Sequence, residues 1–197
     1  RAHKDGVRRL RVHVLTDGRD VSERSALSYL KPLEELLQSL SVDGCSYAVA
    51  SGGGRMHITM DRYGADWAMV ERGWACHVRG EGECFSSASQ AVSSFYERDS
   101  SLNDQWLPAF VVVDSAGQPV GRIQDGDSVL FCNFRGDRAL EISSAFEGRE
   151  VGFEQGSIPD VFYAGMMQYD GDLSIPNNFL VEPPAIDQTV SAFLEAA

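Results

Sequence analysis

Alternating and helical patterns of apolar positions divide the first part of the chain into a strand, a helix and a second strand. Residues 9–15 alternate in polarity and are rich in β-residues, which is typical of a strand. Leucines recur at helical spacing over residues 25–40, and the apolar run 45–50 predicts the next strand. The glycine-rich residues 51–55 predict a flexible loop. This order of elements is typical of an α/β domain.

The same two patterns continue through the middle of the chain. The predicted elements are helices over residues 65–78 and 86–97 and from Asp137, and strands over residues 109–113, 128–134 and 161–168. Residues 169–184 are rich in Pro, Gly and Asn and predict a linker. A capped helix is expected from Asp187 to the end.

Composition changes this picture through its charges. The 197 residues carry a net charge of −12, which argues against a general nucleic-acid binder. All basic residues except Lys4 and Lys31 are arginines, whose planar fork suits carboxylate and phosphate. The excess of arginine therefore fits either a bound small anion or a biased genome composition. No apolar stretch reaches the ~18 residues needed to cross a bilayer, so we expect no membrane contact.

Metal, redox and nucleotide motifs are not evident. The four cysteines form no Cys-x-x-Cys pair, and reduced thiols predict a cytoplasmic protein. No His, Asp or Glu cluster has metal-ligand spacing, so we expect no metal site in this chain. The triple glycine 52–54 lacks the Gly-Lys-Ser/Thr of a phosphate loop. We expect His13 and His77 to be packed or surface histidines rather than ligands.

Arginines follow three of the predicted strands, each with acidic neighbours. In open α/β sheets, ligands bind beyond the carboxyl ends of the strands. If the strands are parallel neighbours, five guanidiniums converge on one pocket: Arg19, Arg55, Arg62, Arg135 and Arg138. Such a pocket suits a doubly anionic ligand such as a phosphorylated carboxylate. The alternative is that each arginine pairs locally, with Asp17, Asp20, Asp61 or Asp137, as a staple of its own loop.

Asp20 stands beside Arg19 in the first of these loops. A carboxylate at that place is a candidate general base or hydroxyl acceptor. The alternative role is an Asx-turn or a helix cap.

The three loops, taken in order, resemble a known family. The segments are His13-Val-Leu-Thr-Asp-Gly-Arg-Asp20, residues 51–63 with Met60-Asp-Arg62, and residues 121–138 with Asn133-Phe-Arg-Gly-Asp-Arg138. They are similar to the inserted phosphotransferase domain of cofactor-independent phosphoglycerate mutase, in its plant and trypanosomatid branch. Tyr169-Asp-Gly-Asp172 and Ile175-Pro176 resemble the family's return hinge.

This resemblance implies a fold and an activity. It implies a mixed, largely parallel sheet flanked by helices on both faces, in an enzyme that interconverts 3-phosphoglycerate and 2-phosphoglycerate. A serine of an alkaline-phosphatase-like domain accepts the phosphoryl group beside Mn²⁺ (or Mg²⁺ or Co²⁺), and 2,3-bisphosphoglycerate is not required. Carried over by motif, Arg19 and Asp20 bind the glycerate, with Asp20 a candidate for proton transfer. Arg55, Arg62, Arg135 and Arg138 hold carboxylate and phosphate.

The departures from the family pattern define what this chain lacks. The nucleophilic serine, the metal ligands and an upstream substrate-binding histidine belong to other parts of such an enzyme. We therefore expect residues 1–168 to be most of the substrate-binding domain, and residues 169–197 to be the hinge and the start of the phosphatase domain. The Met-less start at Arg1 also predicts a piece of a longer enzyme that is inactive alone. We expect the full-length enzyme to be a monomer. The alternatives are a stand-alone module that binds phosphorylated acids and an acidic protein-interaction domain.

Overall fold

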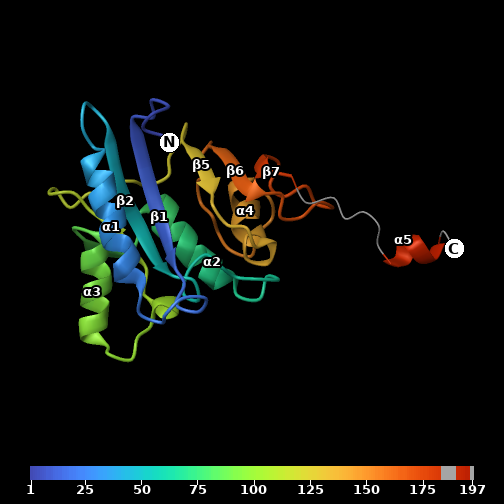
Figure 1. The fold of residues 1–197 in the computed structure, drawn as a ribbon, viewed down its shortest axis with the longest axis horizontal. Coiled ribbons are helices and arrows are strands. Elements are labelled where there is room, and N and C mark those ends of the chain that lie inside the picture. Colours follow the sequence, from blue (N-terminus) through green and yellow to red (C-terminus); the bar gives the residue numbers. More distant parts are fainter. Residues whose placement is uncertain (183–189, 196–197) are drawn as a thin grey trace.

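The computed structural model describes residues 1–182 and 190–195, and these residues form strands and helices in alternation (Figure 1). The elements are β1 (Arg9–Thr16), α1 (Ala26–Ser39), β2 (Ser46–Gly54), α2 (Trp67–Trp74), the π-helix η1 (Ala75–Arg79), β3 (Glu83–Phe85), α3 (Ala88–Arg98), the 3-10 helix η2 (Asp104–Trp106), β4 (Phe110–Val112), β5 (Ser128–Phe131), the 3-10 helix η3 (Gly136–Arg138), α4 (Leu140–Phe146), β6 (Phe162–Met167), β7 (Phe179–Val181) and α5 (Val190–Glu195).

The strands form two sheets rather than one. The first has the order β1-β2-β4-β3, in which β1 is parallel to β2, β3 is parallel to β4, and β2 and β4 are antiparallel. The second has the order β5-β6-β7 and is parallel throughout. The expected α/β fold with mixed, largely parallel strand pairing is therefore confirmed. The strand β5, which precedes the third arginine loop, lies in the second sheet.

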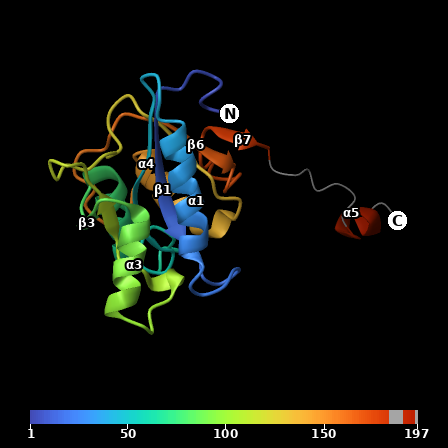
Figure 2. The same ribbon diagram turned by 60° about the vertical axis from the view of Figure 1, so that its left-hand side comes forward.

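Helices cover both faces of the first sheet (Figures 1 and 2). On one face, α1 and α3 bury apolar side chains such as Leu30, Val92 and Phe95 against Phe110 of β4. On the other, α2 and η1 pack Trp74 into a second core with Ile142 of α4. The segment α2–η1 thus lies between the two sheets and holds them together.

The prediction of a flexible glycine-rich loop over residues 51–55 is wrong, because the glycines form the buried end of β2. Their missing side chains allow neighbouring backbone to come close. A Cβ on Gly54 would lie 2.2 Å from the carbonyl oxygen of Gln105, and one on Gly52 would lie 2.4 Å from a methyl of Val14. Parallel pairing with β1 continues to Gly54, which aligns with Thr16. The ends of β1 and β2 are consequently held rigidly, side by side.

Two short strands were not predicted, and one predicted helix is only partly described. The strand β3 has three residues, and β7 falls in the segment whose composition predicts a linker. The helix expected from residue 187 contains α5, whereas residues 187–189 and 196–197 lie outside the described residues. No helix of the described residues is long and apolar enough to span a bilayer.

Candidate functional site

Ion pairs between different loops connect the three arginine-bearing segments. Arg55, after β2, pairs with Asp17, after β1, at 2.7 Å. Arg135, after β5, pairs with Asp20 at 3.0 Å. Arg62 and Asp137 lie 3.5 Å apart and connect the second and third segments. Each of these three arginines therefore pairs with an aspartate of a different loop and not with one of its own loop.

Arg138 lies close to three of the other arginines. Burial lowers the pKa of Arg138, and the charges of Arg62, Arg55 and Arg19 lower it further, while Asp137 acts in the opposite direction. The Arg138 guanidinium donates to the Met60 carbonyl. Within the described residues, neither Arg19 nor Arg138 has a carboxylate partner within ion-pair distance. Positive charge is therefore concentrated where the three loops meet.

Arg55 is the most enclosed of these arginines. Only 7% of it is exposed, and its Nε has no hydrogen-bond partner among the described residues. A buried donor without an acceptor is rare in folded proteins and costs about 1–3 kcal/mol. The loops thus hold a buried guanidinium whose Nε–H group is available for a further acceptor. Such a group suits an anionic ligand with several oxygens.

Asp20 is exposed, and its carboxylate serves the pair with Arg135. The turn at this place is closed by its neighbour, because the Asp17 carboxylate accepts the backbone N–H of Asp20 at 2.9 Å. The Asx-type contact considered for Asp20 therefore belongs to Asp17. The Asp20 carboxylate remains accessible for proton transfer or hydroxyl binding.

Asp104, a residue that the sequence patterns did not single out, positions the first arginine loop. It is buried, and its Oδ2 accepts the N–H groups of Ser25 and Ala26 at 2.8 and 2.9 Å, which caps α1 from outside the helix. Its backbone carbonyl accepts the Thr16 hydroxyl at 2.6 Å. Only a motif search that paired a distant aspartate with a helix start could have found it, because 78 positions separate Asp104 from Ala26.

Glu141 plays a similar part for the second loop and was also missed. Its Oε1 accepts the N–H of Gly64 at 2.9 Å, and its Oε2 is buried without a partner in the described residues. Burial raises the pKa of Glu141, and the nearby charge of Asp61 raises it further against the hydrogen bond from Gly64. Glu141 thus joins the loop that carries Arg62 to the helix that follows Arg138.

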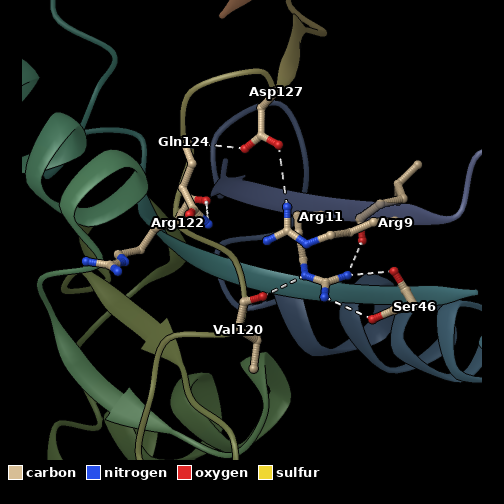
Figure 3. Close-up of polar contacts among 8 residues, drawn as sticks. Arg9, Arg11, Ser46, Val120, Arg122, Gln124 and Asp127 are labelled. Carbon is tan, nitrogen blue, oxygen red and sulfur yellow. Dashed lines mark hydrogen bonds and ion pairs between the residues drawn. The ribbon is translucent and has the colours of Figure 1, made fainter. Parts of the chain in front are cut away.

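Other arginines lie at the opposite end of β1 and differ in their partners (Figure 3). Arg11 donates to the carbonyls of Val120, Leu10 and Ser46 and to the Ser46 hydroxyl, at 2.6–2.9 Å. Arg9 pairs with Asp127 at 3.5 Å. Arg122, in contrast, points away from both. Arg11 therefore uses most of its N–H donors within the protein, and few remain to bind a ligand.

A metal centre is not evident in the part of the chain that the structure describes. No three or more His, Cys, Asp or Glu side chains of residues 1–182 and 190–195 are arranged to hold a metal ion. The chemistry of the described site is that of guanidiniums and carboxylates.

Comparisons with known proteins identify the family of this chain. Residues 1–171 match the family model described as BPG-independent PGAM N-terminus (iPGM_N). The chain is 57% identical over 192 residues to a probable 2,3-bisphosphoglycerate-independent phosphoglycerate mutase of Leptospira interrogans, and 52% identical over 194 residues to the 2,3-bisphosphoglycerate-independent phosphoglycerate mutase of Trypanosoma brucei brucei. These alignments cover 97% and 98% of this chain.

A solved structure extends the likeness to the fold. The phosphoglycerate mutase of Leishmania mexicana, crystallised at low cobalt concentration, superimposes with a TM-score of 0.93 at 50% identity over 99% of this chain. The chain spans about 35% of the length of the curated relatives that it matches, and 36% of the Leishmania chain. We conclude that this chain belongs to the family of N-terminal parts of 2,3-bisphosphoglycerate-independent phosphoglycerate mutases.

Proposed function

We propose that this chain is the phosphoglycerate-binding part of an enzyme that interconverts 3-phosphoglycerate and 2-phosphoglycerate through a phosphoserine, in glycolysis and gluconeogenesis. The observation that supports it most is the set of ion pairs between loops, which joins Arg55, Arg62 and Arg135 to neighbouring loops, together with the close approach of Arg138 to Arg19, Arg55 and Arg62. A phosphate and a carboxylate on one small molecule match that excess of positive charge. The names of the relatives supply the reaction.

In this proposal the described residues bind and orient the glycerate. Arg19 and Asp20 hold its carboxylate and hydroxyls, and Arg55, Arg62, Arg135 and Arg138 hold carboxylate and phosphate. In the same proposal, Asp20 assists proton transfer by accepting the proton of the attacking hydroxyl. Transfer of this kind depends mainly on positioning and on stabilisation of charge, for which rigid guanidiniums are suited.

The phosphoryl group would leave the substrate oxygen for a serine and then return to the neighbouring hydroxyl of the same glycerate. The serine and the divalent metal, Mn²⁺ in this proposal or otherwise Mg²⁺ or Co²⁺, are assigned to the rest of a longer polypeptide. Residues 1–168 then form the substrate-binding domain, and residues 169–197 the hinge and the start of a phosphatase domain. The longer enzyme is proposed to be a cytoplasmic monomer, and this chain is proposed to bind substrate weakly without turnover.

Calorimetry with 3-phosphoglycerate tests the binding role. Arg135→Ala should weaken binding about 10- to 150-fold, because a hydrogen bond between charged groups contributes about 1.5–3 kcal/mol. Arg98→Ala is the matched control, because Arg98 pairs with Glu83 on the exposed surface and lies outside the three loops. Binding that is equal in wild type and Arg135→Ala would contradict the proposal.

Turnover by the chain itself tests its incompleteness. We expect no conversion when 3-phosphoglycerate and Mn²⁺ are added. A mutase rate above background would mean that the described arginine site suffices for catalysis.

A further inference from the structure

Three buried side chains and the half-buried His13 form a continuous run of hydrogen bonds. His13 Nδ1 lies 2.7 Å from Ser51 Oγ, and the same oxygen lies 2.8 Å from His77 Nδ1. On its other side, His77 Nε2 lies 3.1 Å from Thr59 Oγ1. Ser51 has one hydroxyl proton to donate, so one histidine accepts it and the other donates its own N–H. All donors along the run therefore point the same way, either from His13 toward Thr59 or from Thr59 toward His13, depending on the histidine tautomers.

Thr59, at the end of this run, has an unfavourable backbone conformation. Its φ is 68°, in the left-handed region, which a β-branched residue rarely adopts. Such a conformation costs on the order of 1–3 kcal/mol and persists only where the surroundings enforce it. Thr59 is 2% exposed, and its N–H donates to the Met69 carbonyl at 2.9 Å. A Cβ on Gly73 would lie 2.1 Å from its hydroxyl, so α2 also confines it.

The strained residue directly precedes two contacts of the arginine site. Met60 follows it, and the Met60 carbonyl accepts the guanidinium of Arg138. Two residues later, Arg62 approaches Asp137. A change of φ at Thr59 would turn the Met60 carbonyl and redirect Arg62, which would alter the distances within the cluster.

The two histidines can serve this purpose without adding charge beside the arginines. Burial lowers the pKa of His77 well below its ordinary value, and the neighbouring His13 lowers it further. Burial is also the main cause that lowers the pKa of His13, to about 4. Both rings are therefore neutral near pH 7, and each can donate one hydrogen bond and accept another.

We propose that His77 is a positioning residue for the arginine site: through its hydrogen bond to Thr59, backed by Ser51 and His13, it maintains the left-handed turn that sets Arg62 and the carbonyl bound by Arg138. The test of this inference by ligand binding rests on the proposed binding of phosphoglycerate. The test by amide hydrogen exchange does not require a ligand.

Substitutions at Thr59 separate positioning from packing. Thr59→Val keeps the shape and removes the hydroxyl, and it should weaken 3-phosphoglycerate binding about tenfold. Thr59→Ser keeps the hydroxyl and should bind within twofold of wild type. Thr59→Gly removes the hydroxyl and also the steric cost of positive φ. It should therefore bind better than Thr59→Val, whereas a role in packing alone predicts that glycine, which leaves the larger void, binds worse.

Amide hydrogen exchange of residues 58–64 gives a readout that needs no ligand. Exchange should be at least tenfold faster in Thr59→Val than in wild type and near wild type in Thr59→Ser. Ser143→Ala is the matched control, because it removes a different buried hydroxyl pair, with Tyr163, that takes no part in the run, and it should leave this segment unchanged. If Thr59→Val does not fold, Ser51→Ala breaks the run one link earlier and should accelerate the same exchange.

The two proposals fail in different ways. If wild type does not bind 3-phosphoglycerate, the proposed function fails, and the exchange rates still decide the role of His77. If wild type binds, but Thr59→Val shows wild-type affinity and wild-type exchange, the positioning role of His77 is overturned.

Discussion

The two groups of arginines on β1 and its neighbours differ in what receives their hydrogen bonds. The strand arginines, Arg9 and Arg11, lie near the amino end of β1, and Arg11 donates to three backbone carbonyls and one hydroxyl. The site arginines, which are Arg19, Arg55, Arg62, Arg135 and Arg138, lie past the carboxyl ends of the strands and mainly face carboxylates of other loops. The end of β1 lies roughly 16 Å from Arg11, at ~3.3 Å per residue.

This difference separates arginines that build the fold from arginines that are free to bind. A backbone carbonyl in a sheet or tight loop cannot move away, so the guanidinium that it binds is fixed. A carboxylate on a loop can exchange its place with the carboxylate or phosphate of a ligand, which is also anionic and accepts two parallel hydrogen bonds from a guanidinium. The residue type alone does not distinguish the two, and composition bias remains the interpretation for arginines in neither group.

The largest effect on stability should come from Arg11. Arg11→Met keeps the apolar stem and removes four hydrogen bonds, three of them to carbonyls, which should lower the free energy of unfolding by about 2–4 kcal/mol. Binding of 3-phosphoglycerate by the folded variant should stay within twofold of wild type. Urea denaturation and calorimetry measure the two quantities. A wild-type urea midpoint for Arg11→Met would remove the distinction between the groups.

Removal of one carboxylate from the site should cost less and should be reversed by an anion. Asp17→Asn leaves the buried Arg55 without its counter-charge and should destabilise the fold by about 2 kcal/mol, because a buried charge loses its partner. Inorganic phosphate should raise the melting temperature of this variant more than that of wild type, since the ion can replace the carboxylate. Equal increases of the melting temperature in both proteins would show that phosphate does not replace the Asp17 carboxylate.

The sequence patterns predicted where the arginines of the candidate site lie better than they predicted the residues that hold these arginines in place. The reason is physical. Arg19, Arg55, Arg62, Arg135 and Arg138 follow strand ends, and the rule that ligands bind there needs only local patterns. Their partners could not be assigned, because Arg55–Asp17 depends on the pairing of β1 with β2, and Arg135–Asp20 depends on how the two sheets pack. Asp104 and Glu141 act across long stretches of sequence and leave no local pattern.

The helices and strands were likewise predicted only where a local sequence pattern specifies them. The long strand β1 and the helix α1 follow strong periodicities and lie within about a residue of their predicted bounds. The glycines of β2 were predicted to form a loop, because the contacts that require them in a strand, such as Val14 against Gly52 and Gln105 against Gly54, appear only in the folded structure. Three-residue strands such as β3 and β7 are too short for a periodic pattern and depend on their neighbours for existence.

The buried histidines lie between the two arginine groups and should make stability depend on pH. Folding lowers the pKa of His13 from 6.5 to about 4, so the unfolded chain binds more protons between these values. Stability should therefore be full well above pH 6.5 and should fall as the pH decreases toward 4, with a loss of about 2 kcal/mol through His13 by pH 5. His13→Asn removes the titrating ring, and its stability should fall less between pH 7 and 5. Parallel curves for the two proteins would contradict this assignment.

The smallest effect should come from Arg9, although it belongs to the same strand as Arg11. Its pair with Asp127 is 3.5 Å long, and the Arg9 side chain is 43% exposed, so water screens most of the attraction. Arg9→Gln should change the free energy of unfolding by less than about 0.5 kcal/mol, and the change should vanish in 0.5 M salt. Denaturant curves at low and high salt measure it. A loss comparable to that of Arg11→Met would mean that an exposed ion pair stabilises this end of β1 as much as the backbone hydrogen bonds of Arg11 do.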